Sequence, residues 1–197
     1  MYKRQEVKSL HSARKIALID LALPTLRGLG TLEYQRFIEI SRWLISSDSQ
    51  VDLFEFMIQR VIERHLMSHF EQRGFGKIRY RKLSQLYDEV NVLVSTMAGI
   101  GAENETEAKE AYSAAIKNWQ GNFTMHDRSR LDQLDGVLKK IDQASPMVKR
   151  EVLMSCGCAA ASDGDLTNRE AELLRAIADA IGCPVPPLIS NLQETEN

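Results

Sequence analysis

Apolar residues recur at intervals of three and four along nearly the whole chain, which is the period of an amphipathic helix. Few positions break this pattern, because the 197 residues include only 11 glycines and 5 prolines. No segment shows the sustained alternation of apolar and polar residues that is typical of a half-buried strand. The periodicity predicts an all-α fold of about eight helices, over residues 13–29, 31–46, 52–72, 83–99, 104–120, 131–141, 146–161 and 167–181.

These helices fit one domain, since a chain of this length buries roughly 70% of its unfolded surface without a disulfide or metal. Proline residues refine two of them: Pro24 should kink or interrupt the first helix, and Ser145-Pro146 should begin the seventh. We expect an N-terminal linker (1–12), a helical domain (13–183) made of a first half (13–72), connecting helices (79–143) and a second half (145–182), and an irregular tail (184–197).

Charge and cysteine content exclude several classes of protein. Lys and Arg total 25 and Asp and Glu total 27, so the chain lacks the basic excess typical of nucleic-acid-binding proteins, and we expect no nucleic-acid partner. Three cysteines cannot form a closed disulfide framework, which favours a reducing compartment such as the cytoplasm. No apolar run reaches the roughly 18 residues that a membrane helix needs.

An offset of 115 residues aligns two passages of the chain, SDSQVDLFEFMIQRVI (47–62) and SDGDLTNREAELLRAI (162–177). Each passage has a loop with Asp, a capping residue, and Glu three residues after that cap. The pattern indicates one helix-loop-helix unit used twice. The identical pairs are Ser47/Ser162, Asp48/Asp163, Glu55/Glu170, Arg60/Arg175 and Ile62/Ile177.

The segment CAAASDGDLTNREAELLRAIADAIG (158–182) resembles the signature of TerB-like domains, the all-helical family named for tellurite-resistance protein B. The resemblance implies that acidic loop residues hold a divalent cation. By position these are Asp163, Asp165 and Glu170 in the second half, with Asp48 and Glu55 in the first. Ser49 departs from the family pattern, in which Gly is usual, and this weakens the first site.

Residues 19–66 resemble the cytosolic segment that follows the catalytic domain in some large HtpX-like membrane zinc metallopeptidases. This resemblance implies that the chain is a non-catalytic interaction or regulatory module, the C-terminal part of a membrane-anchored peptidase, with a protein partner or substrate. The alternative from the TerB-like signature is a free-standing, ion-binding stress-response protein.

The acidic loop residues also have a purely structural interpretation. Thr167 followed by Glu170 has the spacing of a capping box, and Asp163-Gly164 is typical of a turn. Both the cation site and the cap stay open at this point.

Catalytic motifs are absent from the sequence. His65 and His69 share a helix face, but the intervening residues HLMSH lack the general-base Glu of a zinc peptidase motif. Cys156 and Cys158 should point to opposite sides of one helix. We therefore expect no active site in this chain.

Overall fold

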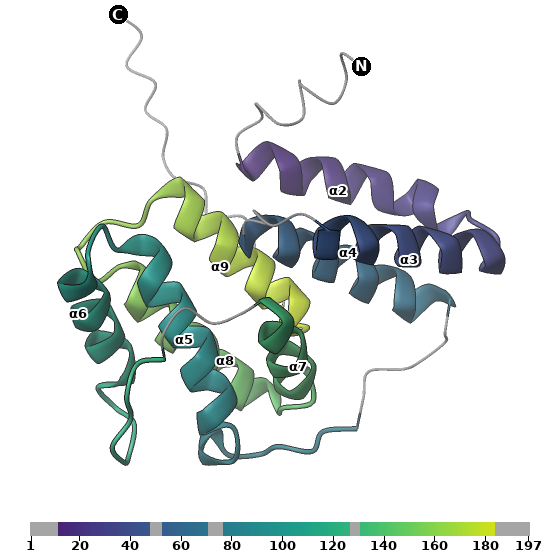
Figure 1. The fold of residues 1–197 in the computed structure, drawn as a ribbon. Coiled ribbons are helices and arrows are strands. Elements are labelled where there is room, and N and C mark those ends of the chain that lie inside the picture. Colours follow the sequence, from purple (N-terminus) through teal and green to yellow (C-terminus); the bar gives the residue numbers. More distant parts are fainter. Residues whose placement is uncertain (1–11, 48–52, 71–76, 127–130, 184–197) are drawn as a thin grey trace, which may run out of the picture.

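The computed structural model describes residues 12–47, 53–70, 77–126 and 131–183 (Figure 1). These segments contain eight α-helices and no sheet, which confirms the all-α prediction. A 3-10 helix, η1 (Leu83–Gln85), precedes α5, and Tyr80 forms an isolated bridge with Ala144. The α-helices are α2 (Ser12–Arg27), α3 (Thr31–Ser47), α4 (Leu53–Phe70), α5 (Tyr87–Gly101), α6 (Glu105–Ile116), α7 (Leu131–Asp142), α8 (Pro146–Ala160) and α9 (Asn168–Ala180).

The helices pack in two groups that α9 joins (Figure 1). In one group α5 contacts α6, α7 and α8, and in the other α2 and α3 both contact α4. α9 packs against α8 and also against α4 and α2. One cluster of buried apolar side chains extends through both groups, so the described helices share a continuous core.

α5 shows how the sequence period builds this core. Val90, Leu93, Val94 and Met97 follow the spacing of one helix face, and each is at most 1% exposed. Burial of an apolar side chain of this size contributes about 1.5–3 kcal/mol. The stripe therefore makes α5 the centre of the group that it forms with α6, α7 and α8.

Helix starts follow the capping signals in the sequence. The Asn104 carboxamide oxygen accepts hydrogen bonds from the backbone N–H groups of Thr106 and Glu107, both at 3.0 Å. The Ser145 hydroxyl accepts one from Val148 N, with Pro146 at the first helical position. These side chains occupy orphan donors of the first turn, which fixes where α6 and α8 begin.

Two helix boundaries differ from the prediction. α2 ends at Arg27 rather than Leu29, and Pro24 lies within it without interrupting it. α6 ends at Ile116 rather than near Gln120. The chain turns there so that the Trp119 ring can stack on Tyr87, with ring centroids 5.2 Å apart.

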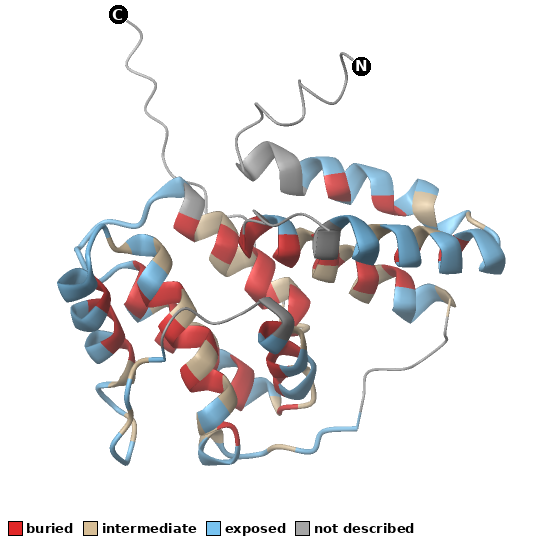
Figure 2. Cartoon of the chain, viewed as in Figure 1, coloured by how far each residue is buried: buried red, intermediate tan, exposed pale blue. Residues whose placement is uncertain are grey.

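Burial is uneven between the two groups (Figure 2). Buried faces dominate α5, α8 and α9, whereas α2 and α3 are exposed over most of their length. Within the segments that the structure describes, no helix is both long and apolar enough to cross a membrane. α2 and α3 lie at the periphery of the packing, where both contact α4.

Candidate functional site

The second acidic loop connects α8 to α9 and is shaped by local hydrogen bonds. Asp163 Oδ1 accepts a hydrogen bond from the backbone N–H of Asp165 at 3.1 Å, which is the pattern of an Asx turn. Gly164 follows with φ of +94°, a conformation that favours glycine. Both aspartate side chains are exposed to solvent.

Glu170 belongs to a capping box at the start of α9. Its Oε2 accepts hydrogen bonds from Thr167 N at 3.0 Å and from the Thr167 hydroxyl at 2.7 Å. The same hydroxyl accepts one from Glu170 N at 3.2 Å. The predicted cap is confirmed, and one carboxylate oxygen of this side chain, which is only 7% exposed, is engaged by it.

The carboxylates of two helices meet near this cap. Glu107 and Glu110 of α6 line a small recess together with Asp163 and Glu170, and we call this the acidic recess. Gly101, at the end of α5, lies against Glu170 so closely that an added Cβ would clash with Oε1. The sequence pattern of the loop gave no signal for the two α6 residues, because they join only through the packing of α6 on α8.

The carboxylates that line the acidic recess do not form a metal coordination shell. Across the described residues, no three His, Cys, Asp or Glu side chains are placed to hold a metal ion. In the first half, Glu55 is exposed in the first turn of α4, while Asp48 lies outside the described residues. The cation site at these positions stays a prediction from the family resemblance.

The second parts of the two repeated passages are both helical, since 53–62 lies in α4 and 168–177 lies in α9. The cap of α4 expected at Asp52 lies outside the described residues. The shared backbone path of the two loops therefore also stays a prediction.

The histidines and cysteines singled out by the sequence occupy separate environments. His65 is half-buried and its Nε2 lies 2.9 Å from Asp179 Oδ2 on α9, whereas His69 is exposed. Cys156 is fully buried and Cys158 is exposed, as expected for opposite sides of α8. Burial raises the pKa of Cys156 to about 12, so its thiol stays protonated and is a poor nucleophile.

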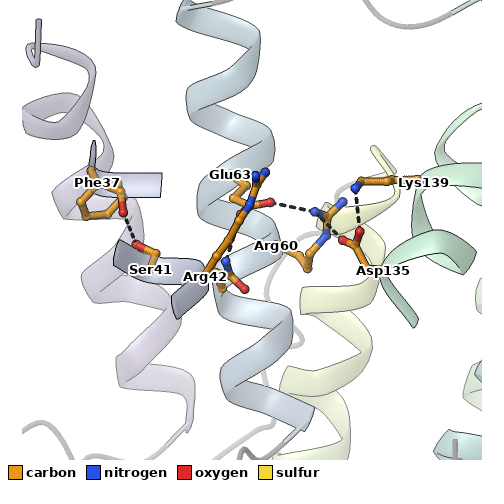
Figure 3. Close-up of polar contacts among 8 residues, drawn as sticks. Phe37, Ser41, Arg42, Arg60, Glu63, Asp135 and Lys139 are labelled. Atoms are coloured by element: carbon orange, nitrogen blue, oxygen red, sulfur yellow. Dashed lines mark hydrogen bonds and ion pairs between the residues drawn. The ribbon is translucent and has the colours of Figure 1, made fainter. Parts of the chain in front are cut away.

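A charged network joins α3, α4 and α7 (Figure 3). Glu63 is nearly buried, and its carboxylate oxygens lie 2.8 Å from Arg42 Nε and 2.7 Å from Arg60 Nη1. Arg60 also reaches Asp135 Oδ1 at 2.7 Å, and Lys139 contacts the other oxygen of that carboxylate at 2.6 Å. Alternating charges compensate one another along this chain of contacts, which indicates a structural role in holding three helices together.

Sequence reasoning missed a concentration of exposed apolar side chains on α2 and α3. The described residues include eleven large apolar side chains that are exposed, and six of them lie on these two helices. We call this set the α2–α3 surface. Its members are Leu18, Leu21, Leu32, Ile40, Trp43 and Leu44.

Only one side of each helix reaches the core, through Ile19 and Leu23 on α2 and through Tyr34 and Ile38 on α3. The available signal was the breadth of the apolar pattern on α2, since the buried stripe of a surface helix covers only part of its circumference.

Comparisons with protein-family models, with curated proteins and with solved structures give no match for this chain. The resemblance to TerB-like domains and to the peptidase segment therefore rests on the residues of the sequence alone.

Proposed function

We propose that this chain is a non-catalytic interaction module of TerB-like character that binds a protein partner through the α2–α3 surface. The observation that carries this proposal is the number of exposed Leu, Ile and Trp side chains on two helices that are consecutive in the chain, four of them on α3. Soluble proteins rarely leave large apolar side chains together in water, and such surfaces usually mark contact sites. Leu21 and Leu32 are the most exposed of them, at 75% and 78%.

Energetics favour contact over exposure at this surface. Each Leu, Ile or Trp that a partner covers contributes roughly 1.5–3 kcal/mol from apolar burial. Trp is also among the residues that most often dominate binding energy in interfaces. A partner that covers three or four of these side chains would thus gain a free energy comparable in size to the entropic cost of association.

The resemblance of residues 19–66 to the segment behind the catalytic domain of HtpX-like peptidases includes the second part of α2, all of α3 and most of α4. We propose on this basis that the module acts on the cytosolic side of a membrane, as the non-catalytic part of such a peptidase. In that setting the α2–α3 surface would present substrates or partners to a catalytic domain elsewhere in the protein.

Site-specific photo-crosslinking in cells tests this proposal. A photoreactive residue replaces Leu21 or Leu32 in the α2–α3 surface, and in matched control chains it replaces Met147 or Met154, which are 66% and 59% exposed on α8. We expect discrete protein adducts from the first pair and none from the controls. Equal labelling at all four positions, or no adduct at any, would overturn the proposal.

A further inference from the structure

The outward side of α3 carries four residues in a pattern with unusual symmetry. Leu32, Arg36, Glu39 and Trp43 are spaced by four, three and four positions, which is the spacing of a coiled-coil seam. At 3.6 residues per turn they lie within about 60° of one another around the helix axis and extend along about 16 Å of it. We call these four residues the outer stripe.

The outer stripe faces away from the protein. Leu32 is 78% exposed and Trp43 is 65% exposed, and Arg36 and Glu39 between them are also exposed. The opposite side of the same helix supplies Tyr34 to the core. Neither Arg36 nor Glu39 forms an ion pair with another residue in the part of the chain that the structure describes.

The outer stripe is complementary to its own reverse, because an apolar residue lies at each end and the two central residues carry opposite charges. When two copies of α3 pack antiparallel about a twofold axis, the residue at each position meets the partner residue that mirrors it. Leu32 then faces Trp43 of the other copy, and Arg36 faces Glu39 of the other copy. A twofold interface needs a surface that is complementary to itself. The outer stripe meets this condition both in its apolar ends and in its central charges.

We infer that two copies of this chain associate through the outer stripes of their α3 helices, with the Leu32–Trp43 contacts at both ends and the Arg36–Glu39 pairs at the centre. The inference rests on the proposed function and deepens it by naming a second copy as a partner of the α2–α3 surface. Apolar contacts supply most of the binding energy, and the charge pairs fix the antiparallel register.

Charge reversal at the centre tests the register directly by sedimentation velocity over a range of concentrations. Arg36→Glu places like charges opposite each other and should weaken the dimer by about tenfold or more, as should Glu39→Arg. Mixing these two variants restores both opposite-charge pairs, so the mixture should form a heterodimer of wild-type strength. The double variant Arg36→Glu/Glu39→Arg should also regain self-association.

Matched controls keep the test specific. Arg150→Glu reverses an exposed charge on α8, and Met154→Glu places a charge at an exposed apolar position of that helix. Both should sediment like the unmodified chain, while Trp43→Glu should sediment as a monomer with an unchanged circular dichroism spectrum. The inference is overturned by a monomeric unmodified chain, by a dimer that Trp43→Glu leaves intact, or by mixed variants that stay monomeric.

Failure of this inference can be told apart from failure of the proposed function. A monomeric chain whose photoreactive residue at position 32 captures other proteins overturns self-association and supports the proposed function. A monomeric chain without adducts at positions 21 and 32 overturns both.

Discussion

The environment of Glu170 distinguishes between two possible roles of its carboxylate, helix capping and cation binding. Oxygen Oε2 already receives two hydrogen bonds from Thr167, and the N-terminal end of α9 adds a favourable electrostatic contribution of about 0.3–1 kcal/mol. A cation at Oε2 would have to compete with these donors for the same lone pairs. At this residue the capping role is thus satisfied without any ion.

Removal of the cap should cost stability, whereas added cations should not restore it. We expect Thr167→Ala to lower the free energy of unfolding by about 1 kcal/mol, because Glu170 N loses its acceptor and Glu170 Oε2 loses the hydroxyl donor. Thr106→Ala, at an exposed position in the first turn of α6, is the matched control. Chemical denaturation measures both values.

The same experiment with millimolar calcium or magnesium tests the alternative. A bound cation would stabilise the folded state by about 2.7 kcal/mol at a hundredfold excess over its Kd. We expect no change in the thermal midpoint. A cation-dependent rise that disappears in Asp163→Asn would contradict this expectation and favour the ion-binding interpretation.

At the scale of elements, Glu63 connects α3 and α7 to α4. Its side chain is 7% exposed and that of Arg60 is 14% exposed, so both charges are largely shielded from water. Glu63→Gln should lower the free energy of unfolding by about 1.5–3 kcal/mol, because the charge-assisted hydrogen bonds from Arg42 and Arg60 are weakened while Arg60 keeps Asp135 as a partner. Glu105→Gln, which breaks the exposed pair with Lys109, should have no measurable effect. Equal denaturation midpoints for the two variants would contradict a structural role for the network.

The elements also mark how far sequence reasoning reaches. The start of a helix was predictable where a capping residue next to it in the sequence determines it, as Asn104, Ser145 and Thr167 do. The end of α6 was not, because it depends on Trp119 stacking on Tyr87, a contact with another helix. Glu107 and Glu110 could not be assigned to the acidic recess for the same reason: only the packing of α6 on α8 brings them there.

For the whole molecule, periodicity predicted the all-α fold but not which apolar faces would be covered. α2 and α3 lie at the periphery and both pack on α4, so each has one side without a neighbouring helix in the described structure (Figure 2). The apolar side chains on those sides are what the proposed function explains. The proposed function therefore requires that a partner covers the exposed apolar side chains of the α2–α3 surface.

The fluorescence of Trp43 measures most directly whether the side chains of this surface become covered. The chain contains two tryptophans, and Trp119→Phe leaves Trp43 as the only one, while a phenylalanine can keep the stacking on Tyr87. As the protein concentration rises, we predict a blue shift of the Trp43 emission and weaker quenching by acrylamide, because a second copy covers the ring. In the control Trp43→Phe, emission from Trp119 should not change with concentration. Trp43 emission that stays typical of solvent, with constant quenching at every concentration at which the chain remains folded, would contradict the association of two copies through the outer stripe.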